Sequence, residues 1–182
     1  MTGDHSLFFL QFTAILDTVL QKLSRYDEGT LLASIFSFAK QTTSGTSSGD
    51  LGREYVNCLR SSMEQIRQKV IDDLFTLALF EKLYTSQMTM ICNWLTERVD
   101  RTLHSYQVNC LSFLIKKTFA EFEHSRQGIP EDVLNFKNYQ TIQNRMRLEE
   151  ATAAVSEASS ATRSPRTSAL GMFEKAKKLA LS

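Results

Sequence analysis

The chain has 182 residues, of which 42% are hydrophobic and 23% are charged, a composition typical of one folded domain rather than of a disordered or membrane-embedded chain. Its 7 glycines and 2 prolines are too few for the many turns of a β-sandwich or barrel, and for the glycine-rich loops that hold nucleotide phosphates. A net charge of +1 provides no overall attraction to nucleic acid or to anionic lipid.

The cysteines and the first residues of the chain favour a cytoplasmic location. Cys58, Cys92 and Cys110 are an odd number without a C-x-x-C pair, which indicates a reducing compartment rather than a disulfide framework. The start, MTGDHSLFFLQF, lacks basic residues and its apolar run is interrupted at Gln11, so it is not typical of a signal peptide. No apolar stretch reaches the 18 residues expected of a membrane-spanning helix.

The first predicted helix covers residues 4–26, where large apolar residues recur every three or four positions. Its apolar stripe consists of Phe8, Phe12, Ile15, Leu16, Val19 and Leu23. A short second helix is predicted around residues 31–38, which is apolar on most sides. The stretch 41–52 is rich in serine, threonine and glycine and is predicted to be a flexible loop.

Residues 53–127 contain neither glycine nor proline, and apolar residues recur through them at helical spacing. A single helix of this length would extend roughly 110 Å at a rise of ~1.5 Å per residue, which a compact domain rarely accommodates. We therefore expect two long central helices with a break near Thr85 and Ser86, because either hydroxyl could cap a new helix. The sequence Gly128-Ile129-Pro130 ends this region.

A last core helix is predicted at about residues 131–157, so residues 1–157 form the predicted helical domain. Residues 158–182 are predicted to be a disordered basic tail that includes a candidate short amphipathic helix at 169–181. The tail has five basic residues and one acidic residue, a net charge of +4, which leaves −3 for residues 1–157. The predicted fold is all-α, an elongated bundle of about five to six helices.

The sequence shows no motif typical of an enzyme or of a cofactor site, and we expect neither catalytic activity nor a bound cofactor. Glu121-x-x-His124 has the ligand spacing of di-iron bundle proteins, but a second Glu-x-x-His pair is missing. The residues Glu97, Asp100 and His104 would share one face of a continuous helix, where charged side chains are usually solvated. The cysteines fall in or beside apolar stripes and are expected to be buried rather than nucleophilic.

Two groups of residues are candidates for binding. Apolar residues of the long helices are predicted to form a groove for another helix, although for each of them a place in the core is the simpler alternative. These residues are Trp94, Phe113, Phe119 and Phe122. Residues of the basic tail are candidates for binding an anionic membrane, with a solubilising end as the alternative. These are Phe173, Lys175, Lys177 and Lys178.

Four stretches of the chain carry a resemblance to a known family. KLSRYDEGTLLASIFSF (22–38), YVNCLRSSMEQIRQKVIDDLF (55–75), EKLYTSQMTMICNWLTERVDRTLHSYQ (81–107) and RLEEATAAVSE (147–157) resemble the C-terminal part of the calcium-dependent activator proteins for secretion. The similarity follows the same order over most of residues 8–157, and leaves out the 41–52 loop and the tail.

This resemblance implies an elongated helical region related to the MUN domain, without catalytic residues. It implies binding of syntaxin and other SNARE proteins and of the secretory vesicle membrane, with no nucleic acid and no small-molecule substrate. It also implies priming of dense-core vesicles for calcium-triggered exocytosis, by a cytoplasmic protein peripheral to these vesicles and to the presynaptic or plasma membrane. The family's calcium- and phosphoinositide-binding modules have no counterpart here. The remaining alternative is a helical scaffold or self-associating adaptor with no SNARE role.

Overall fold

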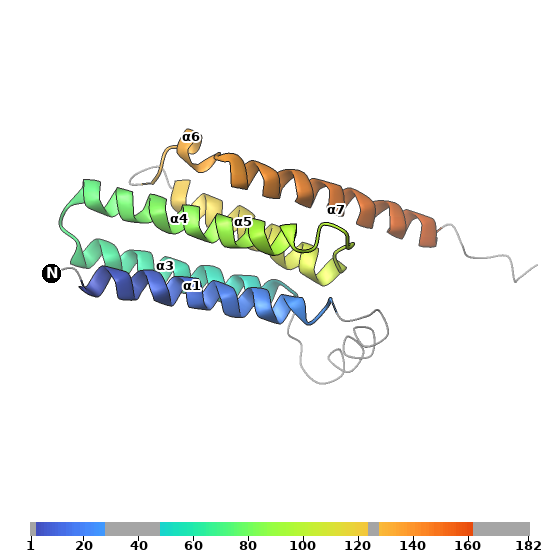
Figure 1. The fold of residues 1–182 in the computed structure, drawn as a ribbon, viewed down its shortest axis with the longest axis horizontal. Coiled ribbons are helices and arrows are strands. Elements are labelled where there is room, and N and C mark those ends of the chain that lie inside the picture. Colours follow the sequence, from blue (N-terminus) through green and yellow to red (C-terminus); the bar gives the residue numbers. More distant parts are fainter. Residues whose placement is uncertain (1–2, 28–47, 124–127, 162–182) are drawn as a thin grey trace, which may run out of the picture.

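The computed structural model describes residues 3–27, 48–123 and 128–161, and these residues form six helices and no strand (Figure 1). The helices are α1 (Gly3–Ser24), α3 (Ser48–Lys69), α4 (Asp73–Thr96), α5 (Ser105–Glu123), α6 (Glu131–Leu134) and α7 (Lys137–Ala161). The predicted all-α class is confirmed. The predicted helices at 31–38 and 169–181 lie outside the described residues.

The long helices form three layers (Figure 1). Helices α1 and α3 make one outer layer, α4 and α5 the middle layer, and α7 lies across the middle layer with α6 beside its start. Neighbouring helices make contact in a closed ring in the order α1, α3, α5, α7 and α4. This ring encloses the core, whose fully buried side chains include Leu16, Leu59, Met88, Leu114 and Ile142.

The region predicted as two long helices is divided into three, and the predicted break at Thr85 and Ser86 is wrong. Both residues lie inside α4, between Tyr84 and Gln87, which are buried. The first break instead comes at residues 70–72. There the Asp72 carboxylate accepts hydrogen bonds from the backbone N–H groups of Leu74 and Phe75, at 3.0 and 3.1 Å, and so starts α4.

A second break, at residues 97–104, separates α4 from α5. No glycine or proline marks it, and the hydrogen bonds that hold it come from other helices, as described below. The predicted helix at 131–157 is also divided, because residues 135 and 136 separate α6 from α7. Helix α7 continues to Ala161, so the predicted boundary at 157 falls inside a helix.

The last part of the predicted loop at 41–52 is helical, because α3 begins at Ser48. Gly52 is buried within α3, and a Cβ atom at this position would lie 3.0 Å from Cδ1 of Phe113 on α5. The missing side chain therefore lets α3 and α5 approach closely. Glycine here serves a helix contact rather than a turn, and the sequence pattern alone could not distinguish the two uses.

This contact predicts that Gly52→Val lowers the free energy of unfolding by about 1–3 kcal/mol, because the branched side chain would overlap Phe113. Urea unfolding followed by far-UV circular dichroism measures the change. Gly52→Ala is the control, since its gain in helix propensity of about 1 kcal/mol offsets a small shift of the Phe113 ring. Equal stability of the valine and wild-type chains would contradict the close contact.

Candidate functional site

Two of the residues predicted to bind a partner are buried in the core of the described bundle. The Trp94 indole is 7% exposed, and its Nε1 donates a hydrogen bond to the Ser24 hydroxyl at 3.0 Å. The Arg98 guanidinium lies over the Trp94 ring, 3.9 Å from its centroid. Phe122 is 1% exposed. In this conformation neither aromatic ring presents a surface to a partner, because each completes the contact between helices of this chain.

The other two residues, Phe113 and Phe119, are half-buried on α5. Phe113 lies against Gly52, and Phe119 stacks on Tyr139 of α7 with ring centroids 4.9 Å apart. The four residues therefore do not form one groove, and partner binding at Phe113 and Phe119 stays a prediction. The four tail residues predicted to bind membrane lie outside the described residues.

An aromatic cluster joins the middle layer to α6 and α7. Tyr84 is at its centre, 1% exposed, with its ring 5.3–6.5 Å from four other aromatic rings. These rings belong to Phe119, Phe122, Phe136 and Tyr139. Such pairs add about 0.5–1.5 kcal/mol each beyond the burial of their area. Phe119 and Phe122, two of the four residues predicted as a docking groove, thus help to attach α7 to the bundle.

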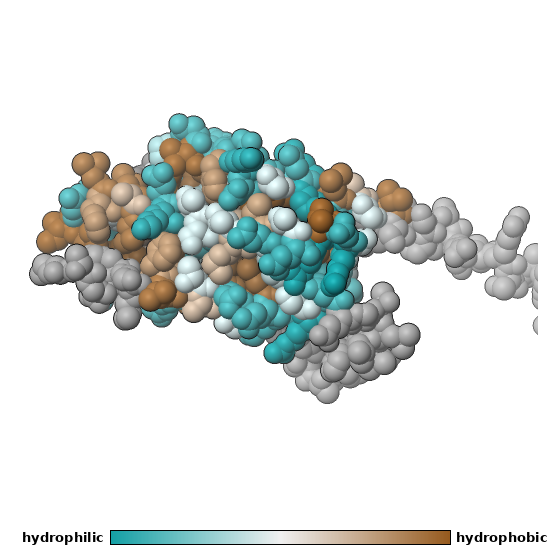
Figure 2. All heavy atoms as spheres, viewed as in Figure 1, coloured by the Kyte–Doolittle hydropathy of each residue, from teal (hydrophilic) through white to brown (hydrophobic). Residues whose placement is uncertain are grey.

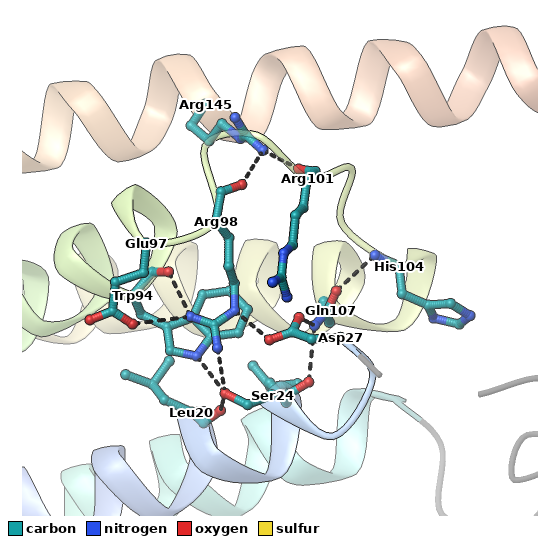
Figure 3. A network of polar contacts seen from close by, with 11 residues as sticks. Leu20, Ser24, Asp27, Trp94, Glu97, Arg98, Arg101, His104, Gln107 and Arg145 are labelled. Carbon is teal, nitrogen blue, oxygen red and sulfur yellow. Dashed lines mark hydrogen bonds and ion pairs between the residues drawn. The ribbon is translucent and has the colours of Figure 1, made fainter. Parts of the chain in front are cut away.

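A polar network at the opposite end holds α1 against the middle layer (Figure 3). Arg98, which follows α4, donates from Nε to the Asp27 carboxylate at 2.6 Å and from Nη2 to the Ser24 hydroxyl at 2.8 Å. Gln107 on α5 donates to the same carboxylate at 2.8 Å and to the Leu23 carbonyl at 2.9 Å. The side chains of Arg98 and Asp27 are 12% and 13% exposed, so this ion pair is largely shielded from water.

Arg145 on α7 holds the connection between α4 and α5 from the other side (Figure 3). Its guanidinium donates to the backbone carbonyls of Arg98, Val99 and Arg101, at 3.2, 3.0 and 2.7 Å. It also pairs with Glu149 at 2.6 Å, and Glu149 accepts a hydrogen bond from the backbone N–H of Leu103. Side chains of α7 thereby satisfy three carbonyls and one N–H group of a stretch without helix, beside the turn hydrogen bonds that it makes itself.

The two most exposed of the large apolar side chains in the described residues lie where α3 is followed by α4, and we call this surface the α3–α4 tip. It consists of Ile71, Leu74 and Phe75, which are 99%, 79% and 46% exposed. Figure 2 shows hydrophobic residues gathered at this end of the molecule. Beside the tip, a groove of about 500 Å³ lies between α3 and α4. Its lining residues are Glu64, Arg67, Gln68, Val70, Asp73, Thr76 and Leu77.

The described residues hold no group of three or more His, Cys, Asp or Glu side chains that could bind a metal ion. Glu121 forms an ion pair with Arg60 of α3, and His124 lies outside the described residues. Glu97, Asp100 and His104 do not share a helical face as predicted, because α4 ends at Thr96. Burial raises the pKa of the Cys110 thiol to about 11, which keeps it protonated and unreactive at neutral pH.

None of the described helices combines the length and the hydropathy needed to cross a bilayer.

Comparison with known proteins finds a family match in the middle layer, which α4 and α5 form. Residues 77–122, from within α4 almost to the end of α5, match the family model of the MUN domain. Over 142 residues, which are 78% of this chain, the sequence is 50% identical to the calcium-dependent secretion activator of Drosophila melanogaster. The chain belongs to the calcium-dependent secretion activator family. It spans about a tenth of the length of this relative. No solved structure matches it significantly.

In this secretion activator chain, the segment that matches the MUN domain contains the second break, at residues 97–104, and three of the five rings of the aromatic cluster. It begins after the α3–α4 tip, at Leu77, and ends at Phe122. It therefore includes Tyr84, Trp94 and the connection at 97–104. The matched segment thus supplies one partner in each of the contacts that attach α1 and α7 to α4 and α5 in the polar network.

The geometry of Arg145 predicts that Arg145→Ala lowers the free energy of unfolding by about 2–4 kcal/mol, because Glu149 would remain buried without its cation. Thermal and urea unfolding of the full chain measure the loss. Arg147→Ala is the matched control, since this neighbouring arginine is exposed and its removal should change stability by about 0.5 kcal/mol or less. Similar losses in the two variants would show that Arg145 does not fix the connection.

Proposed function

We propose that this chain is part of a non-enzymatic vesicle-priming module that binds SNARE proteins, syntaxin among them. In this role it promotes calcium-triggered exocytosis of dense-core vesicles. The observation that carries the proposal is the 50% identity over 142 residues to a protein named for calcium-dependent secretion. The match of residues 77–122 to the MUN domain supports the same role.

The physical mechanism proposed for this role is alignment of helices without covalent chemistry. SNARE proteins present amphipathic helices with an apolar seam, and helices of this kind bind in grooves that have apolar walls and a polar rim. The groove beside the α3–α4 tip contains both kinds of group. Val70 and Leu77 are its apolar residues, and its polar residues are Glu64, Arg67, Gln68, Asp73 and Thr76. A helix held there would lose part of its freedom before it meets its SNARE partners, which lowers the entropic cost of assembly.

The α3–α4 tip is the proposed contact surface for the apolar seam. Ile71 and Leu74 project from the end of the bundle with most of their surface in water, and burial of a Leu or Ile side chain contributes about 1.5–3 kcal/mol. Two such side chains would supply part of the free energy of a weak, reversible complex. The tip replaces the buried Trp94 and Phe122 as the proposed anchor, because its residues can be covered without unfolding the core.

This proposal predicts that Leu74→Asp weakens binding of the full chain to the cytoplasmic part of syntaxin at least tenfold, because a charge at the tip opposes burial in an apolar seam. Isothermal titration calorimetry measures the affinity. Leu148→Asp is the matched control, since Leu148 is 67% exposed on α7 and lies apart from the tip. Circular dichroism of both variants shows whether the fold is intact.

Three outcomes of this titration are informative. Loss of affinity for Leu74→Asp alone supports the tip as the SNARE contact. Equal affinities of all three chains would place the contact elsewhere. Absence of binding by the wild-type chain to syntaxin and to assembled SNARE complexes would refute the proposed function, and concentration-dependent dimers in analytical ultracentrifugation would then favour the self-associating scaffold.

The basic tail is proposed to add a membrane contact, on the basis of its sequence. Lys175, Lys177 and Lys178 flank Phe173, and each basic residue near an anionic surface contributes about 1 kcal/mol. Replacement of the three lysines by alanine is predicted to reduce co-sedimentation of the full chain with phosphatidylserine-containing liposomes. The loss should be largest at low salt, because the attraction is electrostatic. Unchanged sedimentation of the variant would contradict this contact.

A further inference from the structure

Helix α5 begins with a capping box in which histidine takes the place of serine or threonine. Nδ1 of His104 accepts a hydrogen bond from the backbone N–H of Tyr106 at 3.1 Å. In return, the side-chain oxygen of Gln107 accepts from the backbone N–H of His104 at 2.8 Å. The two bonds satisfy two backbone donors at the helix start, which have no partner within the helix itself.

The capping box is connected to α1 through Gln107. The same side chain that accepts from His104 donates through Nε2 to the Leu23 carbonyl and to the Asp27 carboxylate, at 2.9 and 2.8 Å. Gln107 is 1% exposed, so its amide has no water to replace these bonds. The hydrogen bonds of this one side-chain amide thus connect the start of α5 to the end of α1.

An imidazole nitrogen accepts a hydrogen bond only while it carries no proton. We propose that His104 is a pH-sensitive cap, whose protonation at Nδ1 releases the first turn of α5 and weakens its connection to the end of α1. The added proton turns the acceptor into a donor that faces the N–H of Tyr106. It also adds a positive charge at the N-terminus of α5, the positive end of the helix dipole.

Some of the groups that face His104 favour a positive charge on its imidazole, and others oppose it. Tyr26, which follows α1, stacks on the imidazole with ring centroids 5.4 Å apart, and its ring face favours a cation. Burial raises the pKa of Tyr26, so its phenol stays neutral. Asp27 is negative, but its carboxylate already pairs with Arg98 and accepts from Gln107. Arg98 and Arg101 add positive charge, and Glu149 is paired with Arg145.

Protonation of His104 thus removes one hydrogen bond and places a positive charge against the helix dipole. Figure 3 shows the imidazole directed away from Asp27 and Gln107, while the backbone N–H of His104 faces Gln107. Because the ring points out of the network, a proton can reach it without prior opening of the bundle. Histidine side chains in general change charge between about pH 5 and pH 8, which is the range in which the cap should respond.

The test compares the full wild-type chain with His104→Asn, which keeps an oxygen acceptor at the cap but does not titrate. Between pH 8 and pH 5 the melting temperature of the wild type is expected to fall about 2–4 °C further than that of the variant. In the ¹⁵N–¹H spectrum, the Tyr106 amide should shift together with the His104 imidazole. His5→Asn is the control, since it removes a histidine from α1 and should leave the wild-type pH dependence unchanged.

His104→Ala removes the acceptor altogether and is expected to be less stable than His104→Asn at both pH values. Parallel pH profiles of the wild type and His104→Asn would overturn the proposal. A Tyr106 amide that does not move while His104 titrates would overturn it as well, even if the melting temperatures differ. Neither outcome depends on SNARE binding, so this test is independent of the proposed function.

Discussion

The stretch between α4 and α5 is the point on which the arrangement of the layers depends. Residues 97–104 have no helix of their own, and beside a few turn hydrogen bonds their backbone is held by side chains from elsewhere in the fold. Arg145 binds three of their carbonyls from α7, while Arg98 projects from the same stretch to Asp27 at the end of α1. Buried charges are costly unless they are paired, and each arginine has a carboxylate partner, Asp27 for Arg98 and Glu149 for Arg145. One short connection therefore links all three layers.

The aromatic cluster complements this polar end. Around Tyr84, contacts are apolar and tolerate small shifts, whereas the hydrogen bonds of Arg98 and Arg145 require defined directions. Apolar contacts thus supply area at one end of the bundle, and polar contacts at the other end determine the register of the helices. This division explains why aromatic residues in α5 that look suitable for a partner are used within the chain.

The α3–α4 tip carries the two most exposed large apolar side chains of the described residues, Ile71 and Leu74. Asp72 starts α4 and leaves Ile71 in the turn before it, 99% exposed. The family match to the MUN domain begins after the tip, at residue 77. The proposed docking surface therefore adjoins the matched segment without being part of it, so the family match alone could not have pointed to the tip.

Periodicity in the sequence was sufficient to predict an all-α fold, the first helix and the stop at Gly128-Ile129-Pro130. These features depend on local preferences: apolar residues at helical spacing, and a proline that cannot continue a helix. The resemblance to the secretion activators likewise came from the residues alone and agrees with the relative found.

Tertiary structure alone decided where the long helical region is divided and which apolar residues are covered. Residues 97–104 contain no glycine or proline to mark the break, and two side chains more than 40 positions away, Arg145 and Glu149, help to hold it. Gly52 resembled a loop residue because a glycine's role depends on what approaches it, here Phe113. Helical spacing places Trp94 on an apolar stripe, but burial depends on α1 lying against that stripe, and contacts between distant segments leave no local pattern in the sequence.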